Sequence, residues 1–118
     1  MAVTTLYHGA HTAYTLHEGQ CYTRDREVAE WFAKRGVVAT IEVDLDALVV
    51  EECPGYDHDQ NYAPADDPEY RRAAAERGVD VLVYDDEDEL GRVTTCYRLV
   101  SDRALAAVRV AQVEEMAW

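Results

Sequence analysis

Three groups of residues have side chains and positions that are suited to binding or catalysis. His8 ends a β-branched and aromatic segment, Tyr22 and Thr23 stand directly before a helix-forming stretch, and the acidic run 85–89 follows a second β-branched segment. An imidazole can donate one hydrogen bond while it accepts another, and an aromatic ring offers a broad apolar face. A nearby carboxylate stabilises developing positive charge. The elements around these residues decide whether they can meet.

The first third of the chain predicts two short strands and a helix. Residues 3–9 are rich in β-branched and aromatic types and stop at a glycine, which is typical of a strand. Residues 10–20 show no sustained period and are interpreted as a loop, and residues 21–23 as a brief strand. A helix is expected over 26–35, because its apolar residues recur at spacings of three and four. Thr23 or Asp25 can cap its start, and Gly36 supplies its stop.

The middle of the chain continues with alternating strands and one more helix. The period changes to two over 37–45, which predicts a half-buried strand. A long polar segment, 55–68, is interpreted as a surface loop, and a second helix is expected over 69–77 with Asp67 as its cap. Residues 79–84 predict a buried strand, and the acidic run that follows is expected to form a turn.

The last quarter predicts two further strands, over 93–100 and 105–113, with a single helical turn starting at Ser101 or Asp102. Strands and two or three short helices occur in mixed order along the chain. This order favours an α+β domain with mostly antiparallel strands over a doubly wound sheet. The length of 118 residues fits one domain spanning 1–118.

Composition narrows the function classes. The chain is 48% hydrophobic and 30% charged, as in ordinary globular proteins, and its net charge is −13. Such a charge repels phosphate backbones and anionic lipids, so direct nucleic-acid binding and membrane binding are disfavoured, while docking on a basic partner stays open. Three widely spaced cysteines match neither a disulfide framework nor a zinc site. With no basic segment followed by an apolar stretch at the amino terminus, the expected location is cytoplasmic.

The common nucleotide and hydrolase motifs are missing. The sequence holds no GxGxxG after a strand, no GxxxxGK[ST], no GxSxG and no HExxH. Asp57, His58 and Asp59 in the polar loop have the right atoms for a metal, but two carboxylates lack an organised third and fourth ligand. No metal site is predicted. A loop that covers a cofactor or touches a protein target is the preferred interpretation.

The order of the remaining groups resembles the ADP-ribosyltransferase superfamily. Leu6-Tyr7-His8-Gly9, then Cys21-Tyr22-Thr23-Arg24-Asp25 and Ala29-Glu30-Trp31-Phe32-Ala33, is similar to the family's opening motifs and covers about the first third of the chain. The segment 78–85, with Thr95-Cys96-Tyr97 and 107–110, is similar to small phage ADP-ribosyltransferases that act as anti-CRISPR proteins. Residues 86–93 make this chain longer than those proteins by several residues.

The resemblance implies a fold of two split antiparallel sheets with an NAD site in the cleft between them. His8 would bond the adenosine ribose, the backbone of Gly9 would bond the nicotinamide amide, and Tyr22 would stack on the nicotinamide ring beside Thr23. Asp85 would stabilise the oxocarbenium-like centre formed when the nicotinamide bond breaks. His8, Tyr22 and this acid form the implied catalytic set.

Other interpretations of the same residues stay open. His8 can be a structural histidine at a strand end, and Tyr22 can equally pack in the core beneath the helix. Glu87 and Glu89 match the ExE of arginine-modifying transferases, with Glu87 as the second choice for the acid after Asp85. Acidic runs are also common in solvated turns.

Two functions follow as hypotheses. One is an NAD-dependent mono-ADP-ribosyltransferase, or NAD glycohydrolase, that modifies a protein target as a phage anti-defence protein or a toxin. The other is an acidic, non-catalytic inhibitor that occupies the basic surface of a nucleic-acid-binding complex.

Overall fold

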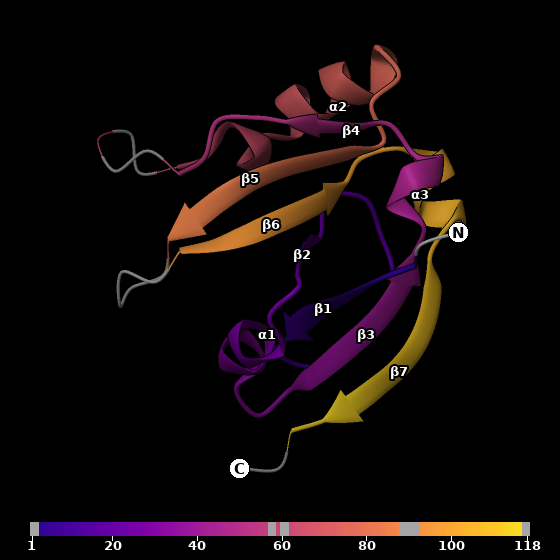
Figure 1. Cartoon of the computed structure of the whole chain (residues 1–118). Coiled ribbons are helices and arrows are strands. Elements are labelled where there is room, and N and C mark those ends of the chain that lie inside the picture. The colour runs from indigo at the N-terminus through magenta and orange to yellow at the C-terminus, as the bar shows by residue number, and fades with distance from the viewer. Residues whose placement is uncertain (1–2, 57–58, 60–61, 88–92, 117–118) are drawn as a thin grey trace.

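Seven strands and three α-helices make up the computed structural model, which describes residues 3–56, 59, 62–87 and 93–116 (Figure 1). In chain order the elements are β1 (Thr4–Ala10), β2 (Cys21–Thr23), α1 (Arg26–Ala33), β3 (Val37–Val43), β4 (Val50–Glu52), α2 (Pro68–Glu76), β5 (Val81–Glu87), β6 (Val93–Leu99), α3 (Asp102–Ala106) and β7 (Arg109–Glu115). Two short 3-10 helices, Leu45–Ala47 and Pro64–Asp66, connect them. The α+β class is confirmed.

The strands form one mixed sheet in the order β4-β5-β6-β2-β1-β3-β7. Only β4 and β5 pair in parallel, and the other five neighbouring pairs are antiparallel. The two halves of the sheet meet at β1 and β2, which pair at a single position, Tyr7 with Thr23. Figure 1 shows the result: β4, β5 and β6 run across the top, and β1, β3 and β7 diverge from them below. The described strands are therefore joined in one sheet rather than separated into two.

The helices begin where short polar side chains satisfy their free N–H groups. Asp25 caps α1 by accepting from the backbone N–H of Glu27, which decides between the two residues expected there. Asp67 caps α2 in the same way, with Pro68 in the first turn, as the sequence predicts. Ser101 caps α3 through the N–H of Ala104. Polar residues before each helix thus fix where it starts.

β4 was not predicted from the sequence, α1 ends at Ala33 rather than at residue 35, and two boundaries differ further from expectation. β5 continues through the acidic run to Glu87, because antiparallel pairing with β6 extends to Glu87 opposite Val93. Tertiary pairing here overrides the low strand preference of aspartate and glutamate. The last strand is 109–115 rather than 105–113, since the residues after Ser101 form α3, with Leu105 packed against the core.

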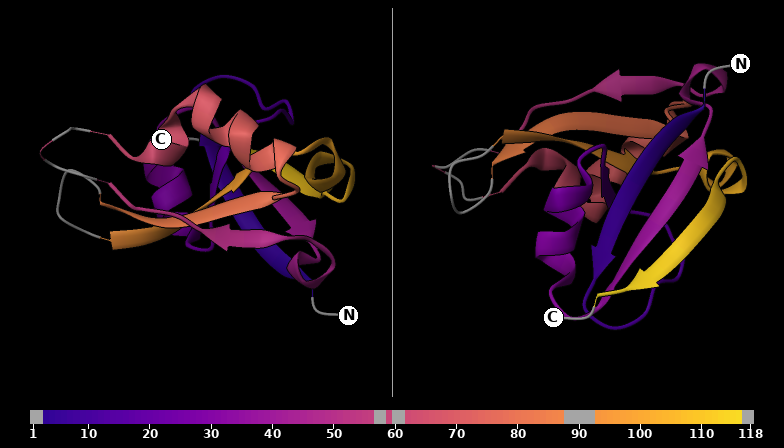
Figure 2. Two further views of the ribbon diagram at one scale, coloured as in Figure 1. Left: turned by 90° about the horizontal axis from the view of Figure 1, so that it is seen from above. Right: turned by 60° about the horizontal axis from the view of Figure 1, so that its bottom comes forward.

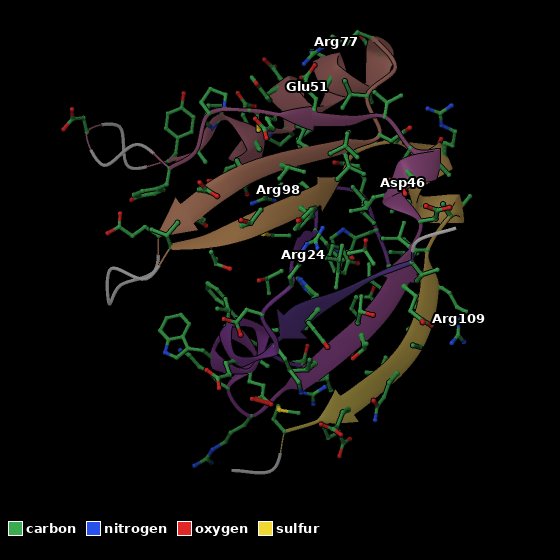
Figure 3. All side chains as sticks on the ribbon, in the orientation of Figure 1. Arg24, Asp46, Glu51, Arg77, Arg98 and Arg109 are labelled. Carbon is green, nitrogen blue, oxygen red and sulfur yellow. The ribbon has the colours of Figure 1, made fainter. Side chains whose placement is uncertain are left out.

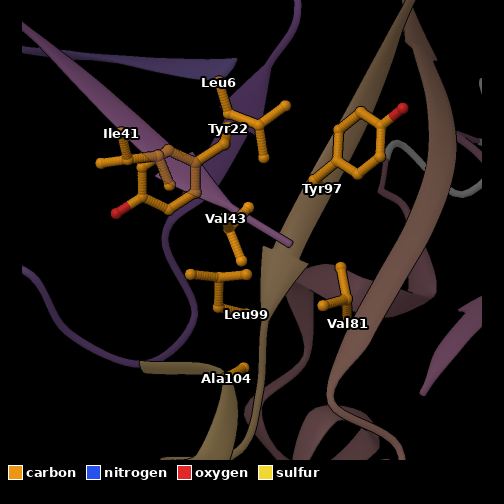
Figure 4. Close-up of a cluster of buried hydrophobic side chains, with 8 residues drawn as sticks. All are labelled: Leu6, Tyr22, Ile41, Val43, Val81, Tyr97, Leu99 and Ala104. Carbon is orange, nitrogen blue, oxygen red and sulfur yellow. The ribbon is translucent and has the colours of Figure 1, made fainter. Parts of the chain in front are cut away.

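Each face of the sheet carries its own core. One face is covered by α3, the 3-10 helix 45–47 and the segment that includes Tyr14 and Leu16. Its buried residues, shown in Figure 4, are Leu6, Tyr22, Ile41, Val43, Val81, Tyr97, Leu99 and Ala104. The other face carries α1 over β1 and β3, and α2 over β5 and β6. Figure 2 shows both helices from two further directions.

Gly9 lets α1 lie close to β1. A Cβ on this residue would stand 2.0 Å from the carbonyl oxygen of Ala29 and 2.7 Å from the backbone nitrogen of Ala33. Only glycine fits a helix and strand at this separation. The close approach brings α1 to the edge of the gap between β1 and β2, where the site described next is found.

Candidate functional site

A pocket of about 260 Å³ lies between α1 and the line where β1 and β2 separate. Its walls come from α1, β1 and β2, from the carboxyl-terminal end of β5 and from β6. The lining residues are Tyr7, His8, Gly9, His11, Cys21, Tyr22, Thr23, Val28, Ala29, Phe32, Asp86, Thr94, Cys96 and Arg98. Four of the residues expected at a site from the sequence, His8, Gly9, Tyr22 and Thr23, are therefore brought together.

His8 occupies the gap that opens between β1 and β2. Past the Tyr7–Thr23 pair the strands separate, and the His8 ring bridges them through a hydrogen bond of 2.7 Å from Nδ1 to the carbonyl oxygen of Cys21. The ring also lies near Tyr14 and Tyr22, with centroid separations of 5.9 and 5.4 Å. These contacts hold the imidazole in one orientation.

The protonation of His8 follows from this setting. Burial lowers its pKa below the usual value, outweighing the bond to Cys21, which acts in the opposite direction. A neutral ring whose Nδ1 faces a carbonyl must carry its proton on Nδ1, because only N–H donates to that oxygen. Nε2 is then an acceptor, and no group within the described residues donates to it. His8 can thus accept a hydrogen bond from a ligand hydroxyl.

Tyr22 belongs to the core. Its side chain has no exposed surface, and its hydroxyl bonds Tyr14 at 2.7 Å and Gln20 at 2.9 Å. Burial raises the pKa of this phenol, so the hydroxyl stays neutral. A ring without an exposed face has nothing to offer a nicotinamide, so the placement favours the core interpretation of Tyr22 over stacking. Its contribution to the site is support for His8.

Gly9 and Thr23 hold the pocket's shape. The missing side chain of Gly9 is explained by the packing of α1, as described above. Thr23 is buried, and its Oγ1 lies 3.0 Å from Oγ1 of Thr94 across the β2–β6 junction. The same oxygen accepts from the N–H of Asp25, just before α1. Thr23 therefore ties together β2, β6 and the start of the helix.

The acid that faces the pocket is Asp86. Side chains alternate along β5, so Asp86 shares its face with Tyr84, while Asp85 and Glu87 take the opposite face. Asp85 is exposed and accepts from Thr95 at 3.2 Å, and neither Asp85 nor Glu87 lines the pocket. Glu89 lies outside the described residues. The sequence predicts that the strand ends before Asp85, but β5 continues to Glu87, and alternation along it places Asp86 on the pocket side.

Asp86 is half-buried, and the described residues satisfy only part of its hydrogen-bonding capacity. Its Oδ1 accepts from the N–H of Glu87 at 2.9 Å, and its Oδ2 lies 3.9 Å from the thiol of Cys96. Burial raises its pKa, as does repulsion from Asp66, whereas Arg98 acts against this. A carboxylate in this state has lone pairs free for a ligand and gains from a nearby positive charge.

Arg98 is the largest group in the site that the sequence did not single out. Its Nε donates to the hydroxyl of Tyr84 at 2.7 Å, and its two terminal nitrogens donate to the carbonyl of Gly19 and to Asp66. Figure 3 shows Arg98 beside β5 and β6, in the upper half of the sheet. It links β5, β6 and two loops, and it keeps the wall of the pocket beside Asp86 in place.

Cys21 and Cys96 line the same pocket as free thiols. They stand diagonally across the β2–β6 pairing, since Cys21 is opposite Arg98 and Cys96 is opposite Thr23. The neighbouring Cys96 sulfur lowers the pKa of Cys21, while Cys21 and burial raise the pKa of Cys96. The three cysteines are widely spaced in the sequence, and no pattern there predicts that two of them lie together.

Comparisons with protein-family models, with curated proteins and with solved structures found no match. The assignment of a function therefore depends on the geometry of the site.

The described residues contain neither a metal-binding cluster nor a membrane-spanning helix. Within the described residues, no group of three or more histidine, cysteine, aspartate or glutamate side chains could hold a metal ion. Asp57 and His58 lie outside those residues. No helix among the described elements is long and apolar enough to cross a membrane.

Proposed function

We propose that this chain binds NAD in the pocket beside His8 and transfers ADP-ribose from it to a protein, with hydrolysis of NAD as the variant in which water accepts. The observation that carries the proposal is the meeting of His8 and Asp86 in one pocket at the divergence of β1 and β2. The motif order resembles ADP-ribosyltransferases, in which a first-strand histidine and a later acid line a cleft between sheets. The finer fold assignment, an ADP-ribosyltransferase-like fold, is part of the same proposal.

The two residues have complementary roles in this proposal. Nε2 of His8 accepts a hydrogen bond from a hydroxyl of the nicotinamide ribose, rather than of the adenosine ribose as the resemblance alone implies, and orients the sugar. Asp86 stands on the opposite wall, on β5, and its partly bonded carboxylate faces the ribose. Because burial makes the charged form of Asp86 costly, a developing positive charge next to it is stabilised more than in water.

The proposed reaction breaks one bond and forms one. The bond between C1′ of the ribose and the nicotinamide nitrogen breaks, and nicotinamide leaves with the electron pair. The oxocarbenium-like C1′ then takes an electron pair from a nucleophile on the target protein, or from water, which loses its proton to solvent. Asp86 stabilises the positive charge at C1′ throughout this exchange.

The test is a direct measurement of NAD binding and cleavage. The purified protein is titrated with NAD by calorimetry and then incubated with NAD and candidate basic target proteins, with nicotinamide release followed by chromatography. We expect binding, and we expect His8→Ala to weaken it on the order of tenfold through the lost hydrogen bond. His17→Ala is the matched control, because His17 is exposed and lies outside the pocket.

An absence of both NAD binding and nicotinamide release would reject the proposal. The net charge of −13 then leaves the acidic inhibitor as the alternative. That alternative predicts inhibition of a nucleic-acid-binding complex which survives His8→Ala and is lost at raised salt, since exposed charges are screened.

A further inference from the structure

A second hollow opens on the surface beside the pocket, at the carboxyl end of α1. It is lined by His11, Trp31, Ala33, Lys34 and Arg35. His11 also lines the pocket beside His8, so the two spaces are neighbours. Phe32 on the pocket side and Trp31 on the hollow side contact each other edge to face, with ring centroids 5.0 Å apart. One aromatic pair thus forms the ridge between them.

Among the described residues, the two cations of this hollow have no acidic partner. Six of the arginines in the described part of the chain form ion pairs with acidic side chains. Lys34 and Arg35 are exposed and make no such pair within that part, in a chain with 24 acidic residues. Two adjacent cations without acidic partners have hydrogen-bond donors that are available to bind an anion from solution.

The backbone conformation of Lys34 is a second, independent indication that its side chain has a role. Lys34 has φ of 54°, a region that favours glycine, and it is the one residue other than glycine with positive φ in the described ranges. Its N–H bonds the carbonyl of Glu30 and closes α1. Glycine would fill this position without strain. A lysine held there at an energetic cost points to a use for its side chain.

The pocket beside His8 is too small for a whole dinucleotide. Its volume of about 260 Å³ is slightly below the usual range of ligand sites and suits one ring and its sugar. The diphosphate must then lie outside it. A protein of net charge −13 repels a diphosphate, so binding requires local cations.

We infer that the hollow at the end of α1 binds the diphosphate of a nucleotide whose nicotinamide and ribose occupy the pocket. This inference rests on the proposed function for the identity of the whole ligand, but the hollow itself recognises a nucleoside diphosphate. Lys34 and Arg35 bind the phosphate oxygens, and Trp31 contributes an apolar face beside them.

The experiment separates the effect of the Lys34 charge on ligand affinity from any effect of this residue on protein stability. Calorimetric titrations use ADP, NAD and nicotinamide riboside, which lacks the diphosphate. Lys34→Gly removes the cation and relieves the backbone, so we expect a melting temperature equal to or above that of the original protein. We expect its affinity for ADP and NAD to fall on the order of tenfold, with that for nicotinamide riboside unchanged.

Arg35→Gln is the second variant, with the same expected loss and no change at the strained position. Arg72→Gln is the matched control, because Arg72 is exposed, makes no ion pair among the described residues and lies on α2, away from the hollow. The control should bind all three compounds as the original protein does.

The outcomes distinguish this inference from the proposed function. Failure of the original protein to bind ADP, or ADP binding that is unchanged in both Lys34→Gly and Arg35→Gln, would overturn the diphosphate site. ADP binding that depends on Lys34 and Arg35, in a protein that releases no nicotinamide from NAD, would support the site and reject the transferase.

Discussion

Two aspartates at opposite ends of β5 behave in opposite ways. Asp80 comes just before the strand and is 2% exposed, and its carboxylate accepts from the N–H of Val49, the hydroxyl of Ser101 and the guanidinium of Arg103. The bonds from Arg103 chiefly, with those from Ser101 and Val49, hold its pKa at about 2 despite burial. Asp86 is less buried, yet its pKa is raised because few donors replace the lost water.

The difference distinguishes a carboxylate with a structural role from one that is available to interact with a ligand. Asp80 ties together the segment before β4, the start of β5 and α3, and all of its partners come from the chain itself. Asp86 faces a pocket with part of its hydrogen-bonding capacity unused. A buried group whose charge is fully compensated stabilises the fold, whereas one that is incompletely compensated gains from a ligand. Each end of β5 can be tested separately.

The largest expected effect is on catalysis at the Asp86 end. If Asp86 stabilises the charge at C1′, Asp86→Asn should lower the rate of nicotinamide release by about 10²–10³-fold, as is typical when one group that stabilises a transition state is removed. The melting temperature should stay level or rise, because the neutral amide avoids the cost of a half-buried charge. Release of nicotinamide and thermal unfolding are measured on the same preparation.

Asp85→Asn is the matched control for that variant. It makes the same chemical change one residue earlier, on the exposed face of β5, and should alter the release rate by less than about twofold. A full rate in Asp86→Asn together with a large loss in Asp85→Asn would show that the acid is Asp85, as the resemblance alone implies.

A smaller effect, on stability, is expected at the Asp80 end. Asp80→Asn removes the charge that Arg103 pairs with and weakens the bonds from Val49 and Ser101. We expect a loss of about 2–3 kcal/mol in the free energy of unfolding, toward the low end for a buried pair because Arg103 is largely exposed. Chemical denaturation measures the loss. An unfolding free energy within about 0.5 kcal/mol of the original would contradict a structural role for Asp80.

The contrast also shows how far the sequence could predict the site. Apart from β4, the order of strands and helices follows from local patterns, and so do the caps Asp67 and Ser101 and the placement of His8 on β1. The identity of the acid does not, because it depends on where β5 ends. In a run of five acidic residues, only pairing with β6 decides which carboxylates face the pocket.

Other parts of the site depend on contacts between distant segments. Arg98 meets Gly19 and Asp66 through the fold, and no spacing in the sequence links the three residues. Tyr22 before a helix fits both a ligand-stacking role and a core role, and only its burial separates these. The period of small apolar residues after Ser101 fits a strand equally well, until the cap and the packing of Leu105 select a helix.

The smallest expected effect is the pH dependence of stability, in which the two aspartates should act with opposite signs. Asp80 has a folded pKa of about 2, below its unfolded value of 3.8, so its stabilisation is complete above pH 4 and is lost as the pH falls toward 2. One proton taken up on unfolding corresponds to a slope of about 1.4 kcal/mol per pH unit in that range. Asp80→Asn should therefore flatten the acid side of the stability curve.

Asp86 should do the reverse, since its folded pKa is raised. Ionising it costs stability, so the folded protein gains from its protonation as the pH falls through the folded pKa toward the unfolded value. Asp86→Asn should remove this gain and make the acid side steeper. Urea unfolding of the two variants and the original protein between pH 3 and 6 measures both slopes. If both variants change the acid-side slope in the same direction, the surroundings of Asp80 and Asp86 do not shift the two pKa values in opposite directions. The contrast between the two ends of β5 would then be wrong.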